Sequence, residues 1–390
     1  MSRYLLKAAI LLQLTLAIYL ICEVRGLRKR LYAFQRKTLS FLRQHELLAY
    51  EFQAFLEQRF KVLEFPRSLK HLPLAEEQGI LLASRKIDIP GVIAPYNASL
   101  IEEADHYLLF FRYDIPAIGD DEVPYHSYIG CVELNSDFLP LSPFTTLDTK
   151  SAFSEDPRVM KVDGQYFITY NELMAGKRTR REVRMATVDS LTKRIESITR
   201  FDRRKMSVEK NWMPFVPDGK TLHFIYTIRP HEVLKLASPQ HNALLQVGVC
   251  DPKCALSSLD WPKQWGIPRG GTPPRLVDGE YLSFFHSSLI DDRGITWYVM
   301  GAYAFEAAAP YRITKISPHP ILFHEIYRTA HQNTANPKVR CIYPAGFVLE
   351  RREGKDLIQL SCGENDSAVK VLTIDKEALL RSLKPVSSGM

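Results

Sequence analysis

Cysteine is scarce in this sequence, with six residues among 390. That density is too low for a disulfide scaffold. Cys250 and Cys254 flank Asp-Pro-Lys and could form half of a zinc site, but no second Cys or His pair at ligand spacing accompanies them. We interpret the segment as a local turn with free or mutually bonded thiols, and the sequence predicts no structural metal and no cofactor.

Basic stripes interleaved with aromatic residues, which typify nucleic-acid-binding surfaces, are also missing. The net charge is +7, but the basic residues between Arg25 and Lys37 supply much of the excess. The basic run from Lys177 to Arg184 is short, and we interpret it as a solvated hairpin tip. Nucleic acid is therefore not an expected partner.

An apolar run from Ala8 to Cys22 lies between basic residues near the N-terminus. A helix from Tyr4 to Val24 would be about 31 Å long, enough for the ~30 Å hydrocarbon core of a bilayer. We predict a single-pass membrane anchor over residues 1–26. A cleaved signal peptide is an alternative, although no clear small-x-small site is present and basic residues follow the run. A buried core helix is a third possibility.

Residues 27–70 are predicted to form a helical stem, because apolar positions alternate at spacings of four and three without Gly or Pro. Thr38, His45 and Arg59 interrupt this seam. The stem could self-associate as a coiled coil, or it could lay its Leu/Phe face on the following domain. Pro66 and Pro73 end the helical region.

The rest of the chain, residues 75–390, contains a repeated β-rich segment preceded in most cases by a turn such as Asp163-Gly164. Its five copies start at positions 107, 166, 222, 281 and 357, and most are followed by a second strand: 183–188, 244–249, 297–305 and 369–374. Units of this size cannot bury their own faces, so they predict an all-β, five-bladed β-propeller. We expect the segment near Ile80–Ile89 to close the fifth blade, because joining first and last blades removes free edges.

An ordered series of motifs accompanies these repeats. It consists of Glu155-Asp156-Pro157-Arg158, Lys210-Asn211-Trp212, Gly270-Gly271-Thr272-Pro273-Pro274, His286, Tyr298 with Gly301-Ala302, and Gly363-Glu364-Asn365-Asp366. Over roughly residues 87–375 the series resembles glycoside hydrolase family 130, the β-mannoside phosphorylases and hydrolases, and related β-mannosyltransferases. The resemblance implies the same five-bladed fold.

Cleavage of a glycosidic bond needs an acid for the leaving oxygen and a nucleophile or base on the opposite face of the sugar. By resemblance, Asp156 stands where the family has its catalytic acid, which passes a proton through a sugar hydroxyl with inversion. Taken alone, Glu155 and Asp156 could simply cap a turn. The residues expected to bind sugar hydroxyls are Asn97, Arg112, Asp114, Glu155, Arg158, Asn211 and Asp366.

A second group of residues is expected to hold an oxyanion by charge-assisted hydrogen bonds. These are Lys210, Arg229, His286 and Tyr298, of which the last three match the family's phosphate-binding positions by resemblance. Lys210 and His286 could instead be ordinary contacts between blades. The family's blade-one Arg falls near Ile129-Gly130-Cys131, where this chain has none. This departure leaves open whether the anion is inorganic phosphate or the phosphate of an activated sugar.

These observations predict a membrane-anchored enzyme that cleaves or forms a mannoside or similar glycoside by inverting single displacement, as a phosphorylase or a transferase. The alternative is a non-catalytic, membrane-anchored glycan-binding propeller. Asn97 and Asn365 match glycosylation acceptors, but we interpret them as sugar contacts. The excess of positive charge after the anchor slightly favours a cytoplasmic location for the propeller. However, an anchor followed by a stem is also the layout of lumenal glycosyltransferases.

Overall fold

The computed structural model describes residues 65–117, 125–174, 180–201, 206–238, 243–249, 261–330 and 339–386. The chain divides into two units, Met1–Leu63 and Glu64–Met390. The predicted anchor and residues 27–64 of the predicted stem lie outside the described residues and stay predictions. Within those described ranges, no helix is long and apolar enough to cross a membrane.

The last six residues of the predicted stem, 65–70, form turns rather than helix. Leu69 and Lys70 both donate backbone hydrogen bonds to the Pro66 carbonyl, at 2.8 and 3.0 Å. Proline disfavours helical backbone in the residue before it, so Pro66 is a physical reason for the absence of helix at Phe65. The stem prediction was therefore wrong at its C-terminal end.

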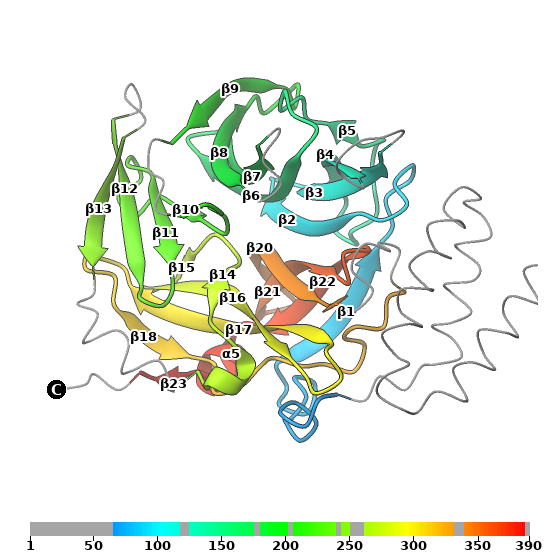
Figure 1. The fold of residues 1–390 in the computed structure, drawn as a ribbon, viewed down its shortest axis with the longest axis vertical. Helices are drawn as coiled ribbons and strands as arrows, with labels where there is room; N and C mark the ends of the chain where they lie inside the picture. Colours follow the sequence, from blue (N-terminus) through cyan, green and yellow to red (C-terminus); the bar gives the residue numbers. More distant parts are fainter. Residues whose placement is uncertain are drawn as a thin grey trace, which may run out of the picture. The chain divides into compact units, whose positions relative to one another are not determined.

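The described strands form five sheets that follow one another along the chain around a common centre (Figure 1). Blade one contains β2 (Tyr96–Glu102), β3 (Tyr107–Pro116), β4 (Tyr125–Leu134) and β5 (Thr145–Thr146). Blade two contains β6 (Ser154–Val162), β7 (Gln165–Leu173), β8 (Arg181–Val188) and β9 (Ile195–Arg200). Blade three contains β10 (Met213–Phe215), β11 (His223–Thr227), β12 (Glu232–Ser238) and β13 (Ala243–Val249).

Blade four is the largest sheet and follows a short 3-10 helix, η1 (Lys263–Trp265). It contains β14 (Arg269–Gly270), β15 (Arg275–Val277), β16 (Glu280–Ile290), β17 (Thr296–Glu306), β18 (Ile313–Ile316), β19 (Val339–Arg340) and β23 (Lys384–Pro385). Blade five contains β20 (Ile342–Arg352), β21 (Lys355–Glu364), β22 (Ala368–Asp375) and β1 (Leu81–Ile87). Contacts of β2 with β6, β6 with β10, β11 with β14, β16 with β20 and β20 with β2 close the ring. The predicted five-bladed propeller is confirmed.

Two terminal strands tie the ends of the unit into the ring. β1 pairs antiparallel with β22, from Leu81 opposite Ile374 to Ile87 opposite Val369, so the predicted closure of blade five is confirmed. Helix α5 (Lys376–Ser382) follows β22, and the Asp375 side chain caps it by accepting from the Ala378 N–H. β23 then pairs with β18 of blade four. These pairings cover strand edges that would otherwise be free.

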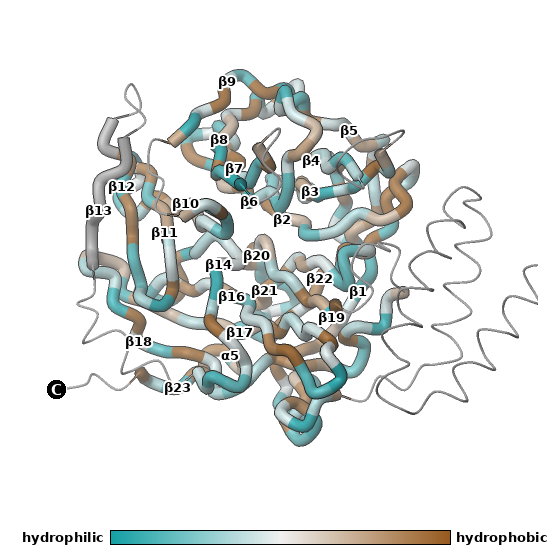
Figure 2. The backbone as a smooth tube through the Cα atoms, in the orientation of Figure 1, coloured by the Kyte–Doolittle hydropathy of each residue, from teal (hydrophilic) through white to brown (hydrophobic). Residues whose placement is uncertain are grey.

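Each blade packs on both neighbours because successive side chains of a strand point to opposite faces. In β3, Leu108 and Phe110 join a core shared with blade two, whereas Leu109 and Phe111 join a core shared with blade five. The hydropathy colouring shows these apolar strand segments alternating with polar ones (Figure 2). All five predicted β-rich segments lie on strands, at β3, β7, β11, β16 and β21.

Blade three differs from the prediction. The segment 244–249, predicted to be the second strand of this unit, falls on β13, and β12 lies between it and β11. The sequence before β12 contains Arg229-Pro230-His231, which interrupts the alternating pattern expected of a strand. Tertiary pairing with β11 forms β12 despite this weak local signal.

The first strands of the blades share one direction around the ring. Tyr96 and Asn97 begin β2, Glu155 and Asp156 lie at the start of β6, and Tyr343 lies near the start of β20. The C-terminal ends of these strands line a cavity of about 670 Å³ that includes Glu102, Lys161 and Phe347. The polar residues and this cavity therefore occupy opposite ends of the same strands.

His231 is a buried ionisable group between blades three and four, 1% exposed. Its Nδ1 lies 2.8 Å from the Tyr311 carbonyl, so Nδ1 carries the proton and donates. Its Nε2 has no hydrogen-bond partner among the described residues, and its ring contacts the Tyr303 and Phe305 rings. Burial lowers the pKa of His231 from 6.5 to about 4, against a smaller opposite effect of the Tyr311 carbonyl.

We therefore expect His231 to make the fold acid-sensitive. Between pH 6.5 and pH 4 the unfolded chain binds a proton at His231 that the folded chain does not. The free energy of unfolding should fall by about 3 kcal/mol across this window. Urea denaturation at several pH values should show that loss in the wild type and not in His231→Asn, which keeps an N–H donor. Equal losses in both proteins would contradict the assignment.

Candidate functional site

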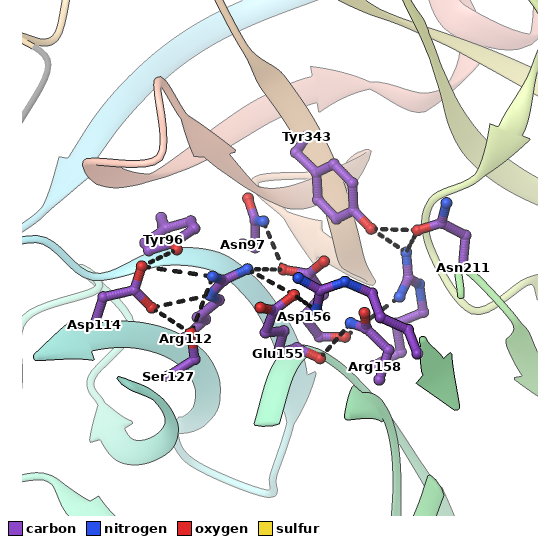
Figure 3. Close-up of polar contacts among 12 residues, drawn as sticks. Tyr96, Asn97, Arg112, Asp114, Ser127, Glu155, Asp156, Arg158, Asn211 and Tyr343 are labelled. Carbon is purple, nitrogen blue, oxygen red and sulfur yellow. Dashed lines mark hydrogen bonds and ion pairs between the residues drawn. The ribbon is translucent and has the colours of Figure 1, made fainter. Parts of the chain in front are cut away.

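Arg112, on β3, lies among three carboxylates from blades one and two (Figure 3). Its Nε donates to Asp114 Oδ1 at 3.1 Å. Its Nη1 lies 3.2 Å from Glu155 Oε2 and 3.4 Å from Asp156 Oδ1. Its side chain is only 8% exposed, so these ion pairs are largely shielded from water. Arg112 thus joins three other predicted site residues, Asp114, Glu155 and Asp156, into one network.

Asp114 is held on its other side by neutral donors. The Tyr96 hydroxyl donates to Asp114 Oδ2 at 2.6 Å, and Ser127 Oγ donates to Oδ1 at 2.7 Å. The Arg112 guanidinium also lies over the Tyr96 ring, 4.9 Å from its centroid. The carboxylate and the guanidinium are therefore fixed before any ligand arrives.

Asp156 receives a hydrogen bond from Asn97 Nδ2 at 2.8 Å. Both residues have left-handed backbone, with φ of 56° and 47°, and the pairing of β6 with β7 shifts between Glu155 and Arg158. Burial acts to raise the pKa of Asp156, but the Arg112 charge, the Asn97 hydrogen bond and the charges of Arg158 and Lys210 lower it overall. At neutral pH Asp156 is a carboxylate.

Arg158 is 3% exposed and connects three further blades to β6. Its Nε donates to the Gly271 carbonyl at 2.6 Å, and its Nη2 donates to the Tyr343 hydroxyl at 2.6 Å and to the Gly270 carbonyl at 3.2 Å. The Tyr343 hydroxyl in turn donates to Asn211 Oδ1 at 2.7 Å. We interpret Arg158 and Asn211 as supports of the channel, and their predicted sugar contacts stay predictions.

Gly270 explains how blades three and four come this close. A Cβ at Gly270 would lie 2.1 Å from the Asn211 carbonyl oxygen, so a larger residue would separate the two blades. The sequence-based interpretation of this glycine pair as permitting close backbone approach is supported.

Cations gather beside Asp156 on blades two, three and four. Lys210 precedes β10, and Arg269 on β14 pairs across the sheet with His286 on β16. Neither Lys210 nor Arg269 has a hydrogen-bond or ion-pair partner among the residues that the structure describes. Burial, together with the charges of Arg181 and Arg269, lowers the pKa of Lys210 against the opposing effect of Asp156.

His286 belongs to this cation-rich side of the site. Its ring is stacked on Tyr298, with centroids 5.8 Å apart, and lies 4.6 Å from the Tyr343 ring. Burial and the charges of Arg158, Arg269 and Lys210 hold the pKa of His286 well below its ordinary value, so the ring is neutral at pH 7. The structure thus brings together three of the four predicted anion-binding residues.

Arg229 is the fourth predicted anion-binding residue, and no contact among the described residues joins it to Lys210, His286 or Tyr298. It forms no hydrogen bond or ion pair with any residue in the described part of the chain. Its role in anion binding stays a prediction.

Asp366 lies in the turn between β21 and β22, with φ of 49°. Burial, and then the charges of Asp156, Asp114 and Glu155, raise its pKa to about 6, although Arg112 lowers it. Its neighbour Asn365 is 1% exposed, and its amide binds the Cys341 N–H and the Tyr327 and Thr329 carbonyls. The interpretation of Asn365 as a sugar contact is therefore wrong, because its amide holds the turn together.

Three residues of the site were missed in the sequence. Tyr343 carries no motif, and Arg269 could have been noticed because it directly precedes Gly270-Gly271. Arg181 lies in the run 177–184, and its Nη1 forms an ion pair with Glu155 Oε2. In the same run, Arg184 is 2% exposed and pairs with Glu172 and Glu182. The solvated hairpin tip was therefore a wrong interpretation for residues 181–184.

Comparison with known proteins now decides the family. The family model described as β-1,4-mannooligosaccharide phosphorylase, glycoside hydrolase family 130, matches residues 143–384, more than half of the chain. The chain belongs to glycoside hydrolase family 130. It is accordingly an enzyme of the class of mannoside phosphorylases and hydrolases. A search of curated protein sequences gives no match.

Solved structures agree on the fold. A mannose phosphorylase from Leishmania mexicana, in complex with phosphate ion, has 14% identity and a TM-score of 0.54, covering 80% of this chain and 94% of that one. A GDP-Man-dependent mannosyltransferase from the same organism has 14% identity and a TM-score of 0.50, covering 77% and 92%. A β-1,2-mannobiose phosphorylase from Listeria innocua has 14% identity and a TM-score of 0.50, covering 82% and 97%.

The Arg112 network predicts a large, pH-dependent loss on Arg112→Met. Removing the cation leaves buried carboxylates unpaired, which costs roughly 3–5 kcal/mol of unfolding free energy at pH 7. In the variant the folded pKa of Asp156 should rise, because burial then acts without the opposing Arg112 charge, so the deficit should shrink as pH falls towards 5. Urea denaturation at both pH values measures this.

The control for this experiment is Arg85→Met, because the Arg85 side chain is 52% exposed, its Nη1 lies 4.0 Å from Asp137 Oδ1, and its hydrogen bond to the Asp137 carbonyl is at the surface. It should change the unfolding free energy by less than about 1 kcal/mol. An Arg112→Met deficit that does not change with pH would mean that lost packing, rather than unpaired charge, destabilises the variant.

Proposed function

We propose that this enzyme cleaves or forms a mannosidic bond by inverting single displacement in the propeller channel, as a phosphorylase or a transferase. The observation that carries the proposal is that one ionised carboxylate, Asp156, lies beside a group of cations whose side chains have no partner among the described residues. Asn97 and Arg112 fix the carboxylate, and Lys210 and Arg269 provide the free positive charge. An acid/base that exchanges a proton with the glycosidic oxygen, and a site for the phosphate that attacks or leaves the anomeric carbon, are the two elements that such a displacement requires.

Hydrolysis with Glu155 as the second carboxylate fits the geometry poorly. Glu155 Oε2 and Asp156 Oδ1 lie 3.2 and 3.4 Å from the same nitrogen, Arg112 Nη1. The two oxygens are therefore no more than about 6.6 Å apart, at the lower limit of the roughly 6.5–9.5 Å found in inverting hydrolases. Arg181 also neutralises Glu155. Both points favour an anion over water as the second reactant.

The anion could be inorganic phosphate or the phosphate of a sugar nucleotide. The solved relatives include both cases, because one is a mannose phosphorylase with phosphate and another is a GDP-Man-dependent mannosyltransferase. Unpaired, partly buried Lys and Arg side chains bind either group through charge-assisted hydrogen bonds.

The ionisation of Asp156 favours the bond-forming direction. A carboxylate can accept the proton that an acceptor hydroxyl loses when it attacks the anomeric carbon. In the cleaving direction Asp156 must first take up a proton, against the lowering of its pKa by Arg112 and Asn97. By resemblance to the family, the proton passes through a hydroxyl of the sugar.

A non-catalytic glycan-binding propeller is the second candidate. A binding module has no need for an ionised carboxylate that is 9% exposed and held by both Asn97 and Arg112, because burying charge costs free energy. We also propose that residues 1–26 anchor the chain in a membrane, with the propeller on the cytoplasmic side. Protease protection of a C-terminal tag in sealed vesicles would show the opposite orientation.

Asp156→Asn tests the proposed function. The amide keeps the shape of the side chain but cannot exchange the proton, so turnover should fall by roughly 10²–10⁴-fold. The Kd for mannobiose, measured by calorimetry, should change by less than about tenfold, because the amide keeps the shape of the side chain. A tenfold change in Kd corresponds to about 1.4 kcal/mol. Turnover is measured as release or consumption of mannose 1-phosphate, and separately with GDP-mannose as donor.

The matched control is Asp163→Asn, at the exposed turn that joins β6 to β7 in the same blade. Asn tolerates the left-handed backbone at this position, so activity should be unchanged. Full activity of Asp156→Asn with both donors would remove Asp156 from the mechanism.

A further inference from the structure

Arg181 lies at the site because its backbone is hydrogen-bonded to the segment that leads into blade three. Its N–H donates to the Ser207 carbonyl at 3.1 Å, and its own carbonyl accepts from the Glu209 N–H at 3.0 Å. Lys210 follows Glu209 directly. This pairing of β8 with residues 207–209 therefore fixes Arg181 beside Lys210 and makes it a constant part of the site wall.

The Arg181 side chain is 23% exposed and pairs with Glu155, whose side chain is 8% exposed. The same oxygen of Glu155 lies 3.2 Å from Arg112 Nη1. Glu155 is thus shared by two guanidinium groups, one from each side. Arg181 is the link between the carboxylate network around Arg112 and the cation-rich side around Lys210.

The charges on the cation-rich side are not balanced. Asp156 is the strongest charge that acts on Lys210, and Arg181 and Arg269 act on it in the opposite sense and more strongly than Glu155. Asp156 is itself shared with Arg112, so three cations meet carboxylates that already have a cationic partner. Like charges held together in a partly buried place repel each other unless an anion lies among them. The carboxylate of Glu155 is the internal group that reaches Arg181, and it already serves Arg112.

We propose that Arg181 is a specificity-determining residue that supplies a third cation to the oxyanion site, with Glu155 as its internal competitor. The proposal rests on the proposed function, because it concerns the anion used at the same site. An oxyanion that approaches Lys210 and Arg269 comes within reach of Arg181 and shares it with Glu155. Arg181 then selects a doubly charged oxyanion over a singly charged one or water.

This arrangement makes the two partners of one ion pair act in opposite directions on anion binding. Loss of the Arg181 charge removes a charge-assisted hydrogen bond to the anion. Loss of the Glu155 charge removes a competing negative charge and frees Arg181. A purely structural ion pair would instead give a loss for both substitutions.

The experiment is titration of inorganic phosphate into the full chain at low ionic strength, followed by calorimetry. Arg181→Met should raise the Kd for phosphate by roughly 10- to 100-fold, as expected for one charge-assisted hydrogen bond. Arg181→Lys should recover most of the affinity. Glu155→Gln should lower the Kd by about threefold or more, because a screened like charge has been removed. Binding of mannobiose should change less than threefold in Arg181→Met.

The matched control is Arg180→Met, the neighbouring residue, which pairs with Glu182 at 2.8 Å. It should leave the Kd for phosphate unchanged. Urea denaturation of each variant identifies any that has lost the fold, and Arg181→Lys keeps the test valid if Arg181→Met is unstable. In that case a Kd equal to that of the wild type in Arg181→Lys, with a lower Kd in Glu155→Gln, supports the proposal.

The outcomes separate this proposal from the proposed function. If Lys210→Met loses phosphate binding while Arg181→Met keeps it, the proposal is wrong and the proposed function stands. Weaker binding in both Arg181→Met and Glu155→Gln means that the pair is structural, and it also overturns the proposal. If neither phosphate nor GDP-mannose binds the wild type, both fail.

Discussion

The candidate site of this propeller depends on one buried guanidinium group, that of Arg112. Arg112 meets the carboxylates of Asp114, Glu155 and Asp156 in a place where its own side chain is 8% exposed. Three carboxylates at such short distances would repel one another and take up protons if the cation were absent. Because Arg112 is present, Asp156 stays ionised and is fixed in a left-handed backbone conformation that an unsupported Asp rarely adopts. The ionisation of the proposed acid/base, Asp156, therefore depends on a residue of the neighbouring blade.

The ring of blades is what makes that dependence possible. Arg158 ties β6 to the Gly270-Gly271 carbonyls and to Tyr343, and Gly270 permits the Asn211 backbone to come close. These contacts join residues of blades two, three, four and five, and β1 completes the fifth blade by pairing with β22. The site is thus complete only when the blades are joined in the ring, since no single blade holds more than part of the polar network.

The strands could be predicted because alternation within each repeat is a local property of the sequence. β12 could not, because its neighbours Arg229-Pro230-His231 give no such pattern and pairing with β11 decides its conformation. The acidic side of the site was predicted through Glu155-Asp156 and the residues around Arg112. Arg181 was not, because its place beside Glu155 follows from backbone bonds to residues 207 and 209. Local composition made it resemble an exposed hairpin residue.

Division of the site into a carboxylate side and a cation side also explains the state of Asp366. The carboxylates of Asp114, Glu155 and Asp156 share the Arg112 charge. That charge is therefore insufficient to keep a fourth buried carboxyl group near them fully ionised. Its pKa is raised to about 6, chiefly by burial and then by those neighbours. At a pH below that value, Asp366 is a neutral carboxylic acid, which can donate a hydrogen bond. A sugar hydroxyl that approaches it therefore meets a group able to donate, whereas Asp156 can only accept. Asp156 and Asp366 thus differ in ionisation, because Arg112 forms an ion pair with Asp156 whereas, among the described residues, Asp366 forms none and burial outweighs the Arg112 charge.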